Sequence, residues 1–296
     1  ALPNHHLTWM AGLRRSVFTG PLAELAHGVI DQTVDFAGCG MHWSELLQAA
    51  PASRFDIVIA TEPKLRNAIL MRRLKPRLFI SPALNFFLSD RKPTSPYPVS
   101  VYEQMLRLAE LAVGRDLSTN CKITPPRRFE DLATHLLPES AQYIGFAPGA
   151  GGERKRWPLA RFIALAKEQV AFGYKAVFFL GPEELDYAND IQSAIPSALF
   201  PEQSNLIENH GGPMLGIALA ARLQAAVAND AGSGHILAAG GPPLVTRFGH
   251  TNSEKFKPPY GRRIAITARD YGGEDVAKIP LSRVRETLMG LLSELS

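Results

Sequence analysis

The sequence predicts an α/β protein of two domains, each built on a parallel sheet that helices cover. Three observations lead to this class. The chain has 296 residues, which is enough for roughly two domains with sizeable cores. Short apolar runs alternate with segments whose apolar residues recur at helical spacing. Strands that alternate with helices form parallel sheets through right-handed crossovers, and two such halves predict a ligand-binding cleft between them.

The first half shows this alternation in its weaker form. Short apolar runs predict strands at residues 7–11, 34–36, 55–60 and 78–80. Apolar residues at helical spacing predict helices at 65–74, 101–113 and 129–136. Pro138, Glu139 and Ser140 then interrupt the pattern, so we place the domain boundary after residue 138. The first predicted domain is therefore 1–138.

The second half alternates more regularly. The predicted strands are 143–147, 176–180, 205–207, 225–228 and 244–248. The predicted helices are 159–172, 182–195, 214–224 and 234–239. Pro158 favours the start of the first of these, because proline fits the first turn of a helix. This half forms the second predicted domain, 139–280, and a terminal amphipathic helix within 281–296 is expected to pack back on the first domain.

Composition narrows the classes of function. Hydrophobic residues make up 46% of the chain and charged residues 20%, as in soluble globular proteins. The formal net charge of +4 suits an anionic ligand, but Lys and Arg are spread along the chain. The sequence contains no dense basic tract, so it does not predict nucleic-acid binding. No apolar run approaches the roughly 18 residues of a membrane-spanning helix.

The two cysteines, Cys39 and Cys121, lie far apart and lack metal-ligand spacing. This usage predicts a reducing, cytoplasmic setting without a disulfide framework. The sequence contains no HExxH motif, no GxSxG motif and no Cys/His cluster, so zinc chemistry and serine hydrolysis have no support. We therefore expect no metal site.

Three loops of the second half follow predicted strand ends, and in an open parallel sheet such loops gather at one edge. The first, residues 148–158, combines Gly149 and Gly151 with Lys155 and Arg156. Either cation suits a diphosphate, and glycine lets an anion approach the backbone closely. A solvated basic loop is the alternative interpretation.

The second loop begins at Gly181 and carries two carboxylates, Glu183 and Glu184. A carboxylate at this edge can accept hydrogen bonds from ribose hydroxyls, as the acid of dinucleotide sites does. The alternative is that these acids only stabilise the positive end of the helix that follows.

The third loop runs from Asp230 to His235, between a predicted strand and a predicted helix. Glycines before a helix leave backbone N–H groups that bind phosphate, which assigns ligand contact to Gly232, Ser233 and Gly234. Asp230 is expected to orient a hydroxyl, and His235 to donate to phosphate. The alternative is that Asp230 caps the helix and the glycines only form a turn.

Two further groups are weaker candidates. Thr251 follows the strand 244–248 and either closes the site or belongs to an ordinary turn. Glu62 follows the strand 55–60, close to Lys64 and Arg66. A solvated helix start is the simpler explanation for these charges.

Four segments of the second half follow one another in a fixed order: 145–151 leading through 155–158 into Arg161 and Phe162, 180–184, Asn229-Asp230-x-Gly232-x-x-His235 with Ala238 and Ala239, and Phe248-Gly249-x-Thr251. Together they resemble glycosyltransferase family 9, the ADP-heptose:lipopolysaccharide heptosyltransferases. Their order and spacing carry the resemblance more than any one segment does. In the first half, residues 2–9 and 55–66 also resemble family segments.

The resemblance implies a GT-B fold, in which two Rossmann-like domains face a cleft and the C-terminal one binds the nucleotide-sugar donor. It implies inverting transfer of heptose from ADP-heptose to a lipid A–inner-core oligosaccharide, without a cofactor. Lys155 matches the cation that contacts the diphosphate, and Glu183 or Glu184 matches the acid near the ribose. Asp230 and His235 match the acid and the histidine of the donor loop. A lipid-linked acceptor also implies peripheral contact with the inner membrane.

The sequence departs from the family pattern at several positions. Family members begin with a strand and a glycine loop that carry the base, so we expect the general base outside this sequence, with Glu62 as a substitute candidate. Ala231 stands where Thr or Ser is usual, and His250 where Pro is usual. The alternatives are a nucleotide-sugar-binding protein without turnover and a glycosyltransferase with another donor sugar. A nicotinamide-dependent oxidoreductase would need a compact GxGxxG, which the sequence lacks.

Overall fold

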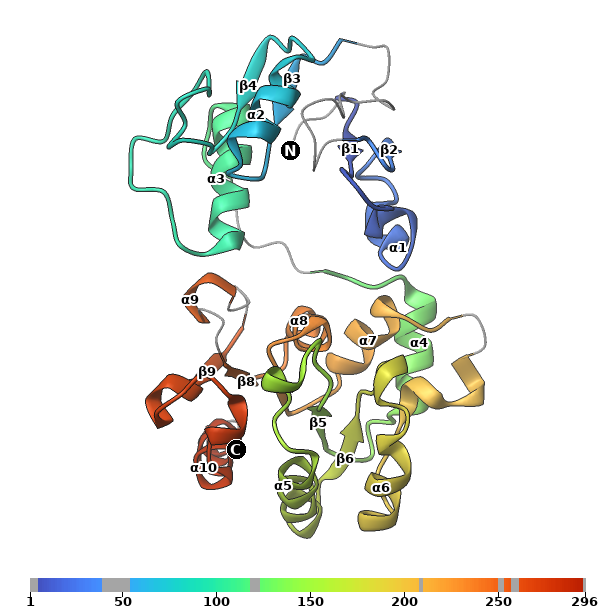
Figure 1. The fold of residues 1–296 in the computed structure, drawn as a ribbon. Helices are drawn as coiled ribbons and strands as arrows, with labels where there is room; N and C mark the ends of the chain where they lie inside the picture. Colours follow the sequence, from blue (N-terminus) through green and yellow to red (C-terminus); the bar gives the residue numbers. More distant parts are fainter. Residues whose placement is uncertain are drawn as a thin grey trace. The chain divides into compact units, whose positions relative to one another are not determined.

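The computed structural model describes residues 5–38, 54–117, 123–207, 210–249, 253–256 and 261–294. The chain divides into two compact units, Ala1–Cys121 and Lys122–Ser296 (Figure 1). Both units combine parallel strands with helices, so the predicted α/β class with two domains is confirmed.

The division between the units lies before helix α4 (Arg127–Leu136), whereas the sequence pattern predicted it after residue 138. α4 packs against α7 (Pro213–Ala220) of the second unit. The guanidinium of Arg222 also donates to the carbonyl oxygen of Leu137, which follows α4. The predicted boundary is corrected for this reason: the break in apolar periodicity marks a turn inside the second unit.

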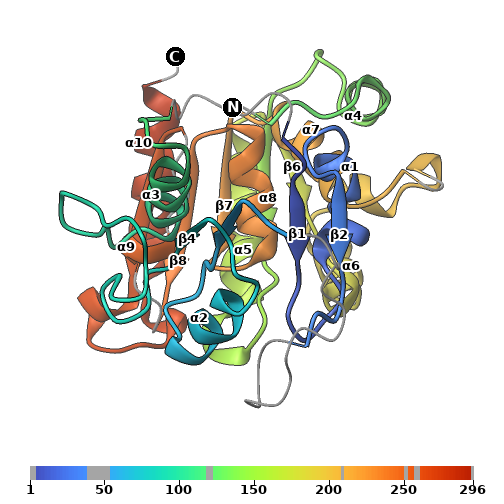
Figure 2. The same ribbon diagram turned by 90° about the horizontal axis from the view of Figure 1, so that it is seen from above.

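Unit 1 contains two pairs of short parallel strands, β1 with β2 and β3 with β4. Their bounds are Thr8–Met10, Gln32–Val34, Ile57–Ile59 and Leu78–Ile80. Helices α2 (Leu65–Arg72) and α3 (Val101–Val113) accompany the second pair, and α3 lies beside β4 (Figure 2). Ser100 caps the start of α3, and Gly114 ends it with a left-handed φ of 74°.

The second strand of unit 1 ends where the sequence pattern placed its beginning. β2 stops at Val34 because Phe36 adopts a left-handed backbone, with φ 51°, which a strand cannot continue. Two short helices between β1 and β2, η1 (Val17–Thr19) and α1 (Ala23–Ala26), were not predicted.

Among the described residues of unit 2, five parallel strands form one sheet in the order β6-β5-β7-β8-β9. Their bounds are Tyr143–Ala147 for β5, Lys175–Phe178 for β6, Ala225–Asn229 for β7, Leu244–Phe248 for β8 and Arg263–Thr267 for β9. Leu199 adds one parallel bridge to Val177, beyond β6. The winding reverses between β5 and β7, because the chain runs outward to β6 and then returns to the other side of β5. The loops after β5 and β7 therefore meet at this switch point.

Helices cover both faces of the sheet in unit 2. α5 (Leu159–Ala171), α6 (Tyr187–Ala194) and α10 (Leu281–Ser293) lie on one face (Figure 1). α4, α7 and α8 (Gly232–Gly240) lie on the other. All residues of β5, β7 and β8 are buried, as expected when both faces of a parallel sheet are covered.

The C-terminal helix α10 is part of the core of unit 2. Val284, Leu288 and Leu291 are buried in the same apolar cluster as residues of β5 and α5. Arg285 forms a two-point ion pair with Glu168 of α5, and its Nε lies 2.7 Å from Oε2. The apolar face of the terminal helix is therefore covered by unit 2 itself, and the predicted packing of the segment 281–296 on the first domain stays a prediction.

Three further details differ from the predicted elements. The helix predicted at 182–195 is interrupted, because η3 (Pro182–Glu184) precedes α6. Residues 205–207, predicted as a strand, form a 3-10 turn, η5 (Asn205–Ile207). The outer edge of β6 is paired by Leu199 instead, through a single bridge that is too short to give an apolar pattern. The strand β9 was not predicted. The remaining short elements are η2 (Glu153–Lys155), η4 (Pro201–Gln203), α9 (Ser253–Phe256), η6 (Ala268–Tyr271) and η7 (Val276–Lys278).

Gly240 allows the close contact between α7 and α8. A Cβ at this position would lie 2.5 Å from Ala220 Cβ and 2.6 Å from the carbonyl oxygen of Ile217. Because the backbone of α7 cannot move aside without separating the helices, we expect Gly240→Ala to lower the free energy of unfolding by about 1–3 kcal/mol. Urea titration measures this change.

The matched control is Gly290→Ala on α10. Apart from its chain neighbours and the nearby backbone of α10, no heavy atom of the described residues lies within 4 Å of its Cβ position. Replacing this helix glycine should therefore raise the free energy of unfolding by roughly 0.5–1 kcal/mol. Changes of the same sign in the two variants would contradict the steric argument.

Candidate functional site

The loops that follow β5 and β7 form the centre of the candidate site. Both leave the carboxyl ends of neighbouring strands at the switch point, where ligands bind in doubly wound folds. The β5 loop covers residues 148–158 and contains η2, and the β7 loop leads directly into α8. Two of the three loops predicted from the sequence therefore lie side by side.

An ion pair between Lys155 and Asp230 connects these two loops. Lys155 Nζ lies 3.6 Å from Asp230 Oδ2. The Asp230 side chain is 8% exposed and the Lys155 side chain 26%. Water and salt screen charges at this depth less than they screen surface charges. A buried carboxylate thus holds a partly exposed cation at the rim of the sheet, where an anion can reach it.

Arg156 connects the β5 loop with the second loop predicted from the sequence, which follows β6. Its Nε donates to the carbonyl oxygen of Ala150 at 2.8 Å. Its Nη2 lies 3.3 Å from Glu183 Oε2 and 4.0 Å from Glu184 Oε1. All three predicted loops are therefore in contact, and Arg156 itself is engaged with protein acids.

The carboxylate of Glu184 occupies space that two glycines leave open. A Cβ at Gly149 would lie 2.7 Å from Glu184 Cδ, and a Cβ at Gly181 would lie 2.8 Å from Glu184 Oε2. Glu184 is buried, whereas the Glu183 side chain is exposed. Glycine is therefore needed at both positions to leave room for the Glu184 carboxylate. The predicted contact of Glu183 or Glu184 with a ribose stays a prediction.

Asn229, the last residue of β7, fixes both ends of the β5 loop. Its side chain is fully buried. Nδ2 donates to the carbonyl oxygen of Pro148 at 2.7 Å. Oδ1 accepts from the backbone N–H of Trp157 at 3.3 Å and from Arg247 Nη2 at 3.3 Å. Because Pro148 opens the loop and Trp157 lies near its end, one amide group determines how the loop is placed against β7.

Asn229, Trp157 and Arg247 were not among the site residues predicted from the sequence. Trp157 is 1% exposed, and its indole N–H donates to the carbonyl oxygen of Ile279 at 2.8 Å. Two signals were available. Asn229 and Trp157 stand in segments that carry the family resemblance, and an arginine inside the strand 244–248 is unusual for a buried strand.

Helix α8 begins at the site without a side-chain cap, since its N-cap residue is Ala231. Gly234 is required in the first turn, because a Cβ there would lie 2.7 Å from the carbonyl oxygen of Asn229. A Cβ at Gly232 would meet open space, and Ser233 is partly exposed. A helix start of this kind is suited to binding an anion through backbone N–H groups.

His235 is exposed and lines a small hollow together with Asp230. The other residues of this hollow are Asn229, Ala231, Gly234, Thr246, Phe248 and Phe256. Because Lys155 contacts Asp230, the predicted cation, acid and histidine gather on one rim of unit 2. Their roles toward a ligand stay predictions.

The remaining predicted residues are placed as follows. Gly151 is exposed in the β5 loop. Thr251 lies outside the described residues. Glu62, in unit 1, accepts from Asn67 Nδ2 at 2.8 Å and lies 2.9 Å from Lys64 Nζ. These local contacts of Glu62 agree with the start of a helix, and its role as a base stays a prediction.

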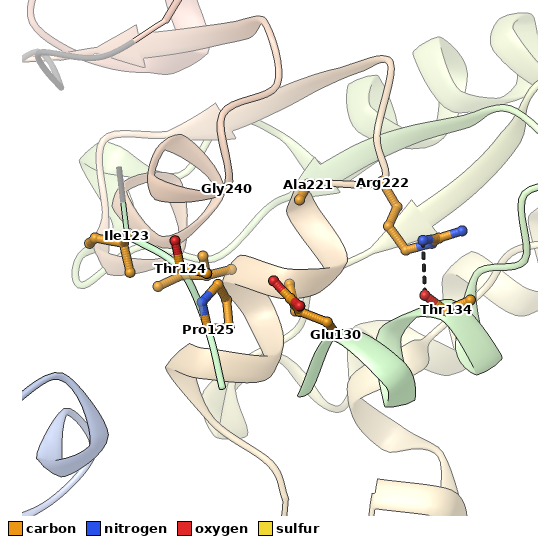
Figure 3. A pocket seen from close by; sticks show the side chains of 10 residues that line it. Ile123, Thr124, Pro125, Glu130, Thr134, Ala221, Arg222 and Gly240 are labelled. Atoms are coloured by element: carbon orange, nitrogen blue, oxygen red, sulfur yellow. Dashed lines mark hydrogen bonds between the residues drawn. The ribbon is translucent and has the colours of Figure 1, made fainter. Parts of the chain in front are cut away.

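A second hollow, of about 220 Å³, lies in another part of unit 2 (Figure 3). Its lining residues are Ile123, Thr124, Pro125, Glu130, Thr134, Ile217, Ala218, Ala221, Arg222 and Gly240. Arg222 donates to the Thr134 hydroxyl at 3.0 Å in its wall. Gly240 is the last residue of α8, at the opposite end from the candidate site, so this hollow is separate from the ligand-binding rim.

Glu202, in η4, has an acid group that is hard to ionise. Its Oε1 lies close to Gly216 in the first half of α7, and burial raises the pKa of Glu202 to about 7. The unfolded chain, with an ordinary pKa of 4.5, releases this proton earlier. Between these two values the folded state binds more protons, so its stability falls as the pH rises.

We therefore expect the free energy of unfolding to fall by on the order of 2 kcal/mol between about pH 5 and about pH 8 because of this group. Glu202→Gln, which resembles the protonated acid, should remove that part of the pH dependence. Urea titrations at both pH values measure it. Glu286→Gln on α10 is the control, because the Glu286 side chain is 68% exposed. A pH dependence that is the same in wild type and Glu202→Gln would contradict the assignment.

Among the described residues, no group of three or more His, Cys, Asp or Glu side chains is arranged to hold a metal ion. In the same part of the chain, none of the helices has both the length and the apolar composition needed to cross a bilayer.

The model of glycosyltransferase family 9 (heptosyltransferase) matches residues 43–278. The chain belongs to this family. It is 33% identical over 169 residues to lipopolysaccharide heptosyltransferase 2 of Salmonella typhimurium, a match that covers 51% of this chain and 47% of that enzyme. It is 28% identical over 237 residues to lipopolysaccharide heptosyltransferase 3 of Escherichia coli, covering 76% of this chain and 68% of that enzyme. The first of these matches spans about half the length of the relative.

Solved family 9 structures have the same fold. The glycosyltransferase of Veillonella parvula aligns with a TM-score of 0.72 at 19% identity, covering 99% of this chain and 89% of that one. ADP-heptose lipopolysaccharide heptosyltransferase II of E. coli aligns with a TM-score of 0.62 at 19% identity, covering 99% and 91%. The GT-B fold expected from the sequence resemblance is confirmed.

Proposed function

We propose that this family 9 chain is an inverting glycosyltransferase that moves heptose from ADP-heptose to a lipopolysaccharide inner-core acceptor. The observation that carries the proposal is the pair of Lys155 with the buried Asp230 at the switch point of the sheet, next to the uncapped start of α8. The curated relatives are lipopolysaccharide heptosyltransferases, and one solved neighbour, an E. coli heptosyltransferase, contains ADP.

The proposed reaction is displacement at the anomeric carbon. An acceptor hydroxyl attacks this carbon while the bond to the diphosphate oxygen breaks, and ADP leaves with the bonding electron pair. Negative charge then grows on the diphosphate. In this proposal Lys155 and the backbone N–H groups at the start of α8 stabilise this charge, because the fold holds them in place before the reaction and they need little reorganisation.

The other residues bind the donor in this proposal. Asp230 holds Lys155 and accepts a hydrogen bond from a donor hydroxyl, and His235 donates to the phosphate. Glu183 or Glu184 accepts from the adenosine ribose. Glu62 is the candidate that the sequence offers for the base that takes the acceptor proton.

The direct test is a turnover assay with ADP-heptose and a lipid A–inner-core acceptor that lacks heptose. Mass spectrometry should show one heptose added per ADP released, and NMR should show the anomeric configuration inverted. UDP-glucose is the control donor. Transfer from UDP-glucose but not from ADP-heptose would make the donor assignment wrong.

A second candidate is a nucleotide-sugar-binding protein without turnover. It is favoured by Ala231, which leaves α8 without the hydroxyl that the family pattern usually has at this position. In that case ADP-heptose would raise the melting temperature of the protein, but no acceptor would gain mass.

The lipid-linked acceptor also leads us to propose that the protein works in the cytoplasm, in peripheral contact with the inner membrane. Cosedimentation with vesicles that contain the acceptor tests this contact. Equal binding to vesicles with and without the acceptor would contradict an acceptor-based contact.

A further inference from the structure

Arg247 is a fully buried arginine within the strand β8. The register of β7 and β8 pairs it with Asn229, so both side chains point to the same face of the sheet. Its guanidinium carbon lies 4.6 Å from the ring centre of Trp157 and 4.3 Å from that of Phe162. Nε and Nη2 donate to Asn229 Oδ1 at 3.4 Å and 3.3 Å.

The charge of Arg247 has no counter-ion in the part of the chain that the structure describes. Its Nη1 is buried and has no hydrogen-bond partner among the described residues. A buried cation without a carboxylate partner is unfavourable, and burial lowers the pKa of Arg247 well below its usual value. An apolar side chain, such as that of Val245 in the same strand, would fill this position without that cost. The presence of an arginine therefore calls for a functional reason.

Arg247 contacts the elements that place both ligand loops. Its guanidinium donates to the side-chain amide of Asn229, and this amide fixes the two ends of the β5 loop. Its ring contact supports Trp157, near the end of that loop. Its backbone carbonyl oxygen accepts from the N–H of Asp230 at 3.1 Å. The Lys155–Asp230 pair therefore rests on two loops that Arg247 holds together.

We propose that Arg247 is a positioning residue for the donor diphosphate. Through Asn229 and Trp157 it fixes the spacing of the β5 and β7 loops, and its uncompensated charge favours an anion at their ends. The identity of the ligand rests on the proposed function, whereas the placement of the loops does not.

The test compares the affinities of ADP and adenosine, which differ in the diphosphate. We expect Arg247→Met to weaken ADP about tenfold and to leave adenosine within about twofold in isothermal titration calorimetry. Arg247→Lys cannot make both donations to Asn229, but it keeps the positive charge. We therefore expect it to lose less affinity for ADP than Arg247→Met does. It also serves as the second variant if Arg247→Met does not fold.

Arg263→Met is the matched control. Arg263 is 8% exposed in the next strand, β9, but it donates to the carbonyl oxygens of Ala238 and Pro242, away from the site. This variant should change stability while leaving the ratio of ADP to adenosine affinity unchanged. An equal change of the ratio in Arg247→Met and Arg263→Met would overturn the proposal.

Hydrogen exchange without ligand provides an independent readout. In Arg247→Met the backbone of residues 148–158 should exchange faster than in wild type, and in Arg263→Met it should not. Unchanged exchange in Arg247→Met would overturn the positioning role. If the wild type binds UDP or GDP and not ADP, the proposed donor is wrong, and the same affinity comparison is made with that nucleotide. If it binds none of them, the proposed function fails, and the exchange result decides on the placement of the loops.

Discussion

Lys155→Met is expected to lower kcat/KM for heptose transfer by about 10²–10³. The variant keeps the length of the side chain but removes the partly exposed cation that lies 3.6 Å from Asp230. The loss should appear mainly in kcat, because the charge on the diphosphate is largest in the transition state. Steady-state measurement of ADP release at varied ADP-heptose separates kcat from KM.

The matched control is Lys167→Met. Lys167 is an exposed lysine of α5 in the same unit, so the two variants change the net charge of the chain equally. Lys167→Met should stay within about twofold of wild type. If Lys155→Met retains kcat/KM within about threefold, leaving-group stabilisation by this lysine is wrong.

Trp157→Ala is expected to produce the largest loss of stability, about 3–5 kcal/mol in the free energy of unfolding. The side chain is 1% exposed and packs edge-to-face on Phe162, with ring centres 5.3 Å apart. Its removal also leaves the guanidinium of Arg247 without one of its two ring contacts. Because a domain has only about 5–15 kcal/mol of stability, the change should be visible in a urea titration.

Trp9→Ala in unit 1 is the control for a general effect of losing a tryptophan. Trp9 is 40% exposed and makes an edge contact with Phe18, with ring centres 5.0 Å apart. Its loss should cost no more than about 1.5 kcal/mol. Equal losses in the two variants would show that Trp157 has no special place in the core of unit 2.

The elements predicted best from the sequence are those whose apolar pattern is local and complete. Residues 143–147 form a strand with the bounds expected, because buried parallel strands need apolar side chains on both faces. Residues 244–248 also form a strand with the bounds expected, although Thr246 and Arg247 interrupt their apolar run. The site loops were found by a related rule: loops after parallel strands collect at one edge, and glycines there leave room for ligands or neighbouring side chains. Gly149 and Gly234 confirm this steric requirement.

Other parts of the fold could not be predicted from local patterns. The segment that pairs with the outer edge of β6 does so through a single bridge at Leu199, which is too short to show periodicity. The assignment of α4 and α10 to unit 2 depends on which surface covers their apolar faces, and a helical pattern says only that such a face exists. Proline and serine around residue 139 mark a break in the chain, but they do not reveal which neighbours remain in contact across it.

The amino-acid sequence by itself determined the α/β class, the family and the set of loops that carry the candidate site. The tertiary structure alone decided that Lys155 faces Asp230, that Arg156 is engaged with Glu183 and Glu184, and that Arg247 is buried behind Asn229. The physical reason is the range of the interactions. Backbone propensity and apolar periodicity act between near neighbours in the chain, whereas these contacts form only after the sheet has brought distant segments together.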